Sequence, residues 1–145
     1  MLLSQTAEYA LRAMAWLAAR EEGTAMRATD LSEATDIPAH YLSKIMRRLV
    51  VSGLLTSRKG HGGGFCLSKP KDQIRYIDIL SAVDSAPVES QCAFGWGVCD
   101  TRNPCPLHPT WSLVSDHFYQ WANRCTLADI TELDPVIQKL RTNTP

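Results

Sequence analysis

Three cysteines and one histidine lie close together in a short segment of the 145-residue sequence. Cys92, Cys99, Cys105 and His108 are separated by six, five and two other residues. Thiolate and imidazole groups are soft ligands that bind iron–sulfur clusters, zinc or copper. Structural zinc sites usually contain cysteine pairs about two to four residues apart, and this segment has none. The spacing therefore favours an iron–sulfur centre over zinc but does not by itself choose the metal.

The segment that carries these residues is predicted to be a functional loop. Residues 84–109 contain four prolines and two glycines and show no helical pattern. A loop of this length is unusual in a small protein unless it has a function. The remaining cysteines, Cys66 and Cys125, fall within strand and helix patterns, and we expect them to be core residues rather than ligands.

A cysteine-dependent redox enzyme or thiol switch is an alternative use of the same thiols. Such a protein needs a cysteine with a lowered pKa, and His108 is the one obvious base nearby. Residues 61–64 match the letters of an esterase oxyanion loop, but the sequence has no G-x-S-x-G motif to accompany them. We therefore expect that the protein is not an enzyme.

Basic residues are concentrated in one part of a chain whose net charge is zero. Residues 37–71 contain no Asp or Glu and seven basic side chains, which are Lys44, Arg47, Arg48, Arg58, Lys59, Lys69 and Lys71. A merely solvated surface mixes the two signs, whereas a segregated basic patch attracts phosphates. This segment predicts binding to double-stranded DNA.

The elements that must position these residues begin with three helical patterns. Apolar residues three and four apart near the start of the chain predict an amphipathic helix of about 17 residues. A second helix is expected at residues 28–35, with Thr29 or Asp30 at its N-cap, and a third begins at Pro38 and reaches about Val51. Two short helices joined by a tight turn, the second of them basic, are typical of a helix-turn-helix.

Two short strands are expected next, at residues 54–58 and 65–68. The six residues between them include four glycines, which allow a sharp turn. This hairpin is the predicted wing, and a short helix over residues 74–83 follows it. Helical spacing returns after the cysteine loop with Leu107, Trp111, Val114, Phe118 and Trp121, before a short helix from Thr126.

We expect the exposed face of the third helix and the wing to contact DNA. The helix face carries His40, Tyr41, Lys44, Arg47 and Arg48. Lysine and arginine on such a face can read guanine edges or hold phosphates. The wing carries Arg58, Lys59 and His61. These wing residues are suited to a minor groove or to the DNA backbone.

The order of these features resembles the Rrf2-type winged helix-turn-helix iron–sulfur transcriptional regulators. The resemblance covers nearly the whole chain and rests on residues 4–20, 37–44, 58–65 and 79–84, the three-cysteine loop and the helix that contains Trp111. A helix-turn-helix alone would be a weak sign. The succession of wing, three-cysteine loop and long helix is specific to this family.

The resemblance implies a homodimeric repressor that binds a DNA operator and senses iron–sulfur status, redox state or nitric oxide. It implies a cluster held by the three cysteines and one further ligand. IscR-like members use a histidine at the position of His108 and point to a 2Fe–2S centre. NsrR-like members with a 4Fe–4S centre can use an acidic residue from the partner's first helix, where Glu8 lies in this chain. The fourth ligand is therefore either His108 or the partner's copy of Glu8, and a 2Fe–2S centre is slightly favoured. A zinc-stabilised or thiol-switched regulator of the same fold is the alternative.

The expected fold class is mainly α with a small two-stranded β wing, a winged helix-turn-helix followed by a long dimerisation helix. We divide it into a DNA-binding domain at 1–84, a cluster loop at 85–109, a dimerisation helix at 107–125 and a short helix with a tail at 126–145. No apolar run approaches the roughly 20 residues that span a bilayer, and the start of the chain lacks a signal-peptide pattern. We therefore expect a cytoplasmic protein with no membrane partner.

Overall fold

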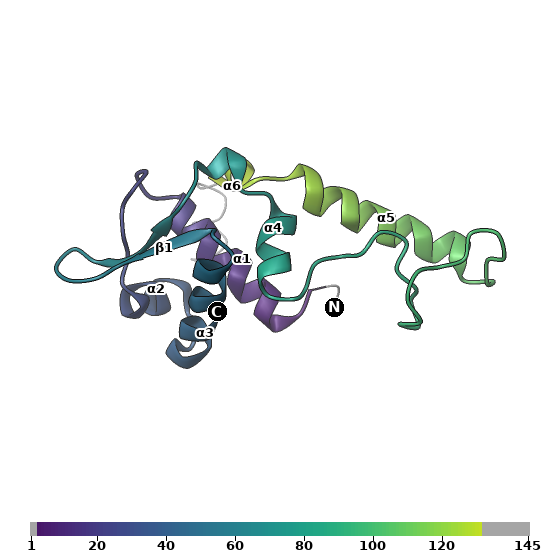
Figure 1. Ribbon diagram of the computed structural model, residues 1–145, viewed down its shortest axis with the longest axis horizontal. Coiled ribbons are helices and arrows are strands. Elements are labelled where there is room, and N and C mark those ends of the chain that lie inside the picture. Colours follow the sequence, from purple (N-terminus) through teal and green to yellow (C-terminus); the bar gives the residue numbers. More distant parts are fainter. Residues whose placement is uncertain (1–2, 132–145) are drawn as a thin grey trace, which may run out of the picture.

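The structure is a computed structural model that describes residues 3–131. Its elements are α1 (Gln5–Ala18), α2 (Ala28–Thr35), α3 (Ala39–Val51), β1 (Leu55–Arg58), β2 (Gly64–Leu67), a 3₁₀ turn η1 (Lys71–Gln73), α4 (Tyr76–Ala82), α5 (His108–Arg124) and α6 (Leu127–Thr131). The predicted mainly helical fold with one two-stranded antiparallel sheet is confirmed. Figure 1 shows a head made of α1 to α4, the hairpin and α6, from which α5 and the preceding loop extend. Across the described residues, no helix has the length and apolar character needed to cross a membrane.

α1 lies at the centre of the head because one of its faces consists of apolar and mostly small side chains. Ala7, Ala10 and Met14 on this face are fully buried, and the small alanines let neighbouring helices approach closely. The helix has 14 residues and is shorter than the predicted 17. It begins only after Ser4, whose hydroxyl accepts a hydrogen bond of 3.1 Å from the amide of Ala7.

α2 has the predicted bounds, and α3 begins at Ala39, one residue after the predicted start, with Pro38 as its N-cap. Backbone and side-chain bonds fix the turn between them. Asp36 ends α2 in the left-handed conformation, with φ of 56°. The Ser32 hydroxyl donates to the carbonyl of Ile37 at 2.6 Å, and the Arg12 guanidinium donates to the carbonyl of Thr35 at 3.2 Å. These bonds hold α3 at a set angle to α2 and α1.

The predicted N-cap of α2 is wrong. Arg27 occupies the N-cap position without a side-chain hydrogen bond, and Thr29 and Asp30 lie inside the first turn. The reason is a long-range pairing, because Met26 forms an antiparallel bridge with Phe65 of the wing. The chain therefore stays extended through Arg27 and turns helical immediately after it.

The wing is a regular hairpin, as predicted. Leu55 pairs with Leu67 at its base, and Arg58 pairs with Gly64 at its tip. The bridge to Met26 adds two backbone hydrogen bonds with Phe65, of 2.9 and 2.7 Å. The hairpin is thus fixed to the chain just before α2.

Replacing Gly64 by alanine is expected to lower the free energy of unfolding by about 2 kcal/mol or more. Gly64 has φ of 131°, and a Cβ atom built there lies 2.2 Å from the carbonyl oxygen of Met26. Chemical denaturation measures the change. Gly62→Ala is the matched control, because Gly62 also has a positive φ but has open space around it. An equal cost in both variants would exclude the Met26 backbone as the cause.

α5 contacts the head only near its C-terminal end within the described residues. Ala122 is its one fully buried residue, packed with Ala7 of α1 and Leu80 of α4. Trp121 stacks on Phe118, with ring centroids 5.6 Å apart, and meets Tyr76 of α4 edge-on. This small cluster anchors the extended helix to the head.

The predicted apolar seam of α5 is therefore only partly covered by its own chain. Phe118 and Trp111 are half-buried, whereas Leu107 and Val114 are 50% and 46% exposed. The exposed end lies away from the head in Figure 1. Of the predicted C-terminal unit at 126–145, the structure describes α6 at Leu127–Thr131, and residues 132–145 lie outside the described part of the chain.

Candidate DNA-binding face and metal centre

α3 separates a buried face from a basic one. Leu42, Met46 and Leu49 are fully buried in the head. The opposite side exposes four of the five candidate DNA-contacting residues of this helix, His40, Tyr41, Lys44 and Arg47. The rings of His40 and Tyr41 lie 4.3 Å apart, and Tyr41 also approaches Tyr9 of α1. The sequence-predicted residues thus share one accessible face.

The three candidate residues of the wing, Arg58, Lys59 and His61, are also exposed. The Arg58 guanidinium donates to the carbonyl of Gly23 at 3.4 Å, which steadies the start of the turn. Figure 1 shows the hairpin projecting beyond the helices of the head. The wing and α3 can therefore contact separate parts of a DNA duplex.

Arg48 differs from its neighbours on α3. It is half-buried and forms an ion pair with Asp84, the residue that follows the C-cap of α4. Sequence reasoning missed Asp84, because 36 positions separate the two residues and no local pattern joins them.

The cysteine loop is built around a small antiparallel turn. Gln91 and Val98 form a bridge, and the amides of Cys92 and Cys99 each donate a 2.8 Å hydrogen bond across it, to Gly97 and Ser90 respectively. The bridge places the first two candidate ligands side by side. A single backbone turn therefore brings together residues that are seven positions apart in sequence.

The indole of Trp111 ties this turn to α5. Its Nε1 donates a 2.6 Å hydrogen bond to the carbonyl of Gln91. The amide of His108 donates to the carbonyl of Cys105 at 3.0 Å, which fixes the third cysteine close to the first residue of α5. Both halves of the loop are thus held at one end of this helix.

A cavity of about 190 Å³ lies between the two halves of the loop. All four loop candidates line it, namely Cys92, Cys99, Cys105 and His108. Nδ1 of His108 is buried and has no hydrogen-bond partner among residues 3–131. A buried polar nitrogen without a partner is costly, and a metal ion is one group that can satisfy it.

The electrostatics of the cavity distinguish its cysteines. Hydrogen bonds from the amides of Phe94 and Trp96 lower the pKa of Cys92. Partial desolvation, followed by the charges of Cys92 and Cys105, raises the pKa of Cys99. Cys92 is therefore more readily deprotonated than Cys99, and a positive centre between the thiolates would relieve their mutual repulsion.

The ligands line the cavity without meeting at one point. In the described part of the chain no group of three cysteine, histidine or acidic side chains is arranged to hold a metal ion. A multi-iron cluster separates its ligands more widely than a single ion does, because different irons bind them. The thiolate and imidazole donors that line the cavity are of the type that binds iron–sulfur clusters.

Glu8 does not belong to this cavity in the same chain. It lies half-buried on α1, and the cavity is lined by loop residues and His108. Figure 1 shows the cysteine loop at the far end of α5, away from α1. A role for Glu8 as a ligand would need a second copy of the chain.

Two aromatic residues at the cavity were not predicted. Phe94 and Trp96 stack with their ring centroids 5.0 Å apart, and both line the cavity. Trp96 is 81% exposed. Their alternate spacing with Cys92 in a glycine-containing turn was the signal that could have placed them at the cavity.

The chain is similar to known proteins over a range that includes both the candidate DNA-binding face and the cysteine loop. The family model Rrf2, described as an iron-dependent transcriptional regulator, matches residues 3–133. The HTH-type transcriptional regulator IscR of Cronobacter sakazakii is 32% identical over 137 residues, covering 94% of this chain and 84% of the relative.

Solved structures agree on the fold. CymR (YrzC), the global cysteine regulator of B. subtilis, matches with a TM-score of 0.75 and 22% identity, over 90% of this chain and 95% of that one. IscR of T. potens matches with a TM-score of 0.70 and 22% identity, over 90% of this chain and 85% of that one.

Proposed function

Because the chain belongs to the Rrf2 family of iron-dependent transcriptional regulators, we propose that it is a DNA-binding repressor controlled by an iron–sulfur cluster. Its relatives are transcriptional regulators, so the chain is a transcriptional regulator and not an enzyme. The proposed signal is iron–sulfur status, redox state or nitric oxide.

One observation carries the cluster proposal. Three cysteines and His108 line the same cavity of the loop, and Nδ1 of His108 is buried without a hydrogen-bond partner in the described part of the chain. A bound iron–sulfur cluster would supply irons that respond to oxidants and to iron supply, and its thiolate ligands would be deprotonated. Cys92, Cys99, Cys105 and His108 are the proposed ligands, with the partner's copy of Glu8 as the alternative fourth ligand.

The chain's own residues prepare the loop for this task. The amides of Phe94 and Trp96 stabilise the Cys92 thiolate, and the Trp111 indole holds the loop against α5. α5 in turn reaches the head through the stacked pair Phe118 and Trp121. A change in the loop therefore has a packed route to the DNA-binding head.

We propose that two copies associate through the exposed apolar side chains of α5. Leu113 and Val114 of α5 are 61% and 46% exposed, and Leu107 at its N-cap is 50% exposed. Within the described part of the chain, the helix has one fully buried residue. In such a dimer each α3 would enter a major groove and each wing would lie against the flanking backbone. Two-fold symmetry predicts an operator with two related half-sites.

The fourth ligand can be assigned by spectroscopy of protein purified without oxygen. We expect His108→Ala to change the visible and electron paramagnetic resonance spectra of the cluster, because it removes the imidazole from the lining of the cavity. Glu8→Ala is the matched variant and should leave both spectra unchanged. The reverse result would assign the ligand to the partner's first helix, and a colourless wild type with bound zinc would contradict the cluster proposal.

A thiol switch of the same fold is the second candidate, and one observation favours it. The Cys92 and Cys99 thiols are close enough to shift each other's pKa, so a two-electron oxidant could join them in a disulfide with loss of two protons. This candidate would be supported if protein purified without oxygen contains no iron, yet loses DNA affinity reversibly when it is oxidised.

A further inference from the structure

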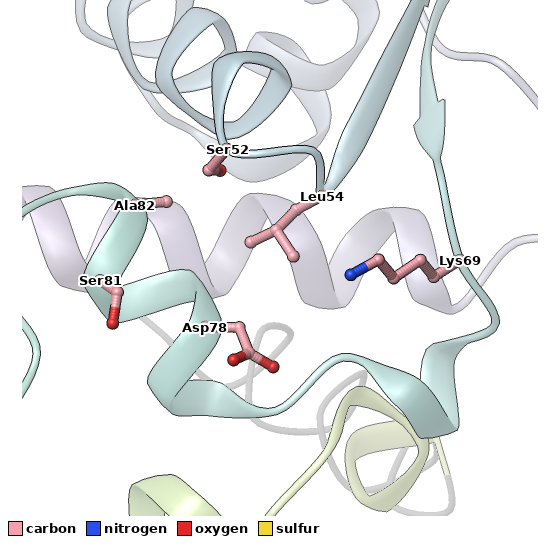
Figure 2. A pocket seen from close by; sticks show the side chains of 6 residues that line it. All are labelled: Ser52, Leu54, Lys69, Asp78, Ser81 and Ala82. Carbon is pink, nitrogen blue, oxygen red and sulfur yellow. The ribbon is translucent and has the colours of Figure 1, made fainter.

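A groove runs between the C-terminal end of α3 and α4. It has a volume of about 430 Å³, and Arg47 and Arg48 of α3 face Ser81 and Asp84 across it. A second hollow of about 290 Å³ shares Ser52 and Ser81 with this groove, and Lys69 and Asp78 line it (Figure 2). The arginines and the lysine therefore lie along two neighbouring hollows.

Asp84 is the residue in this groove that pairs with Arg48. Its side chain is 87% exposed, and that of Arg48 is 39% exposed. An ion pair so open to water contributes little to folding stability. Folding stability alone therefore does not explain why Arg48 and Asp84 are paired.

The position of Arg48 suggests another partner. It lies in the last turn of α3, and the C-terminal end of a recognition helix meets the DNA backbone at the edge of the groove. Guanidinium groups bind carboxylates and phosphates in the same forked geometry. Arg47 lies next to it and is exposed. A phosphate could therefore take the place that the Asp84 carboxylate holds.

We propose that this groove binds a backbone phosphate of DNA, and that Asp84 is an internal competitor that the phosphate displaces from Arg48. The inference rests on the proposed DNA-binding function. Asp84 weakens binding to any duplex, since each binding event must break the pair. The connection that leads to Cys92 begins at Asp84, so a shift of that connection would also change how firmly Arg48 is held.

The test measures DNA affinity of Asp84→Asn, Arg48→Gln and the double variant over a range of salt concentrations. The probe is a duplex that wild-type protein enriches from random-sequence DNA, followed by fluorescence anisotropy. We expect Asp84→Asn to tighten binding about three- to tenfold. Arg48→Gln should instead reduce the logarithmic salt slope by about one, as the loss of one phosphate contact requires. In the Arg48→Gln background, Asp84→Asn should have little effect.

Asp72→Asn is the matched control, because it removes the same charge from η1, which packs against α6. Unchanged or weaker binding by Asp84→Asn would overturn the proposal, provided that its thermal unfolding matches the wild type. Equal tightening with and without Arg48, or in Asp72→Asn, would show general charge repulsion and would also overturn it. A wild type that enriches no duplex and binds no mixed-sequence DNA at low salt would instead refute the proposed function.

Discussion

Replacing Cys92, Cys99 or Cys105 by serine is expected to remove nearly all iron and visible absorbance from protein purified without oxygen. Each thiol lines the same cavity, and a hydroxyl does not replace a thiolate as a soft ligand. Loss of one ligand from a four-ligand centre leaves an iron open to water and oxidants. Iron and sulfide analysis with electronic spectroscopy measures the loss.

Folding should survive each of these substitutions. The three cysteines lie on an extended loop and take no part in the hydrophobic core of the head. Circular dichroism and thermal unfolding should therefore match the wild type. Cys125→Ser is the matched control, since Cys125 lies half-buried at the C-cap of α5 and outside the cavity. Full iron retention in any loop variant would remove that cysteine from the ligand set.

Most of the head could be predicted from sequence because its elements follow local rules. The bounds of α2, the end of α3 and the positions of the two wing strands depend on apolar spacing, a proline and a run of glycines. The N-cap of α2 could not, since it depends on the pairing of Met26 with Phe65. Pairings of residues far apart in sequence leave no local pattern to read.

The candidate site shows the same limit. Ligand type and spacing identified the three cysteines and His108 as candidate ligands. That they line one cavity depends on the bridge between Gln91 and Val98 and on the hydrogen bond from Trp111, which the spacing does not predict. The ion pair of Arg48 with Asp84 could likewise not be predicted from the sequence, because it joins the end of one helix to the end of another. Whether Glu8 completes the site depends on a second chain, and one sequence carries no sign of that geometry.

Removing the charge of Lys44 or Arg47 is expected to weaken operator binding about ten- to a hundredfold for each alanine variant. Both side chains are exposed on the face of α3 that is opposite the buried Leu42, Met46 and Leu49. A residue that reads a base should lose discrimination between operator and mutated sites. A residue that holds a phosphate should weaken all duplexes equally and reduce the salt slope by about one. Fluorescence anisotropy across salt concentrations separates the two roles.

Arg124→Ala is the matched control for this experiment, because Arg124 is an exposed arginine in the last turn of α5. Its loss changes the net charge by the same amount without altering α3 or the wing. Unchanged affinity in both Lys44→Ala and Arg47→Ala would contradict α3 as the recognition helix, since the exposed basic face would then have no role. If Arg124→Ala weakens binding equally, the basic segment acts only through overall charge. A loss of DNA affinity in the α3 variants alone would show that α3 reads the DNA. Because α3 also carries Arg48, the residue that pairs with Asp84 would then lie on the recognition helix itself.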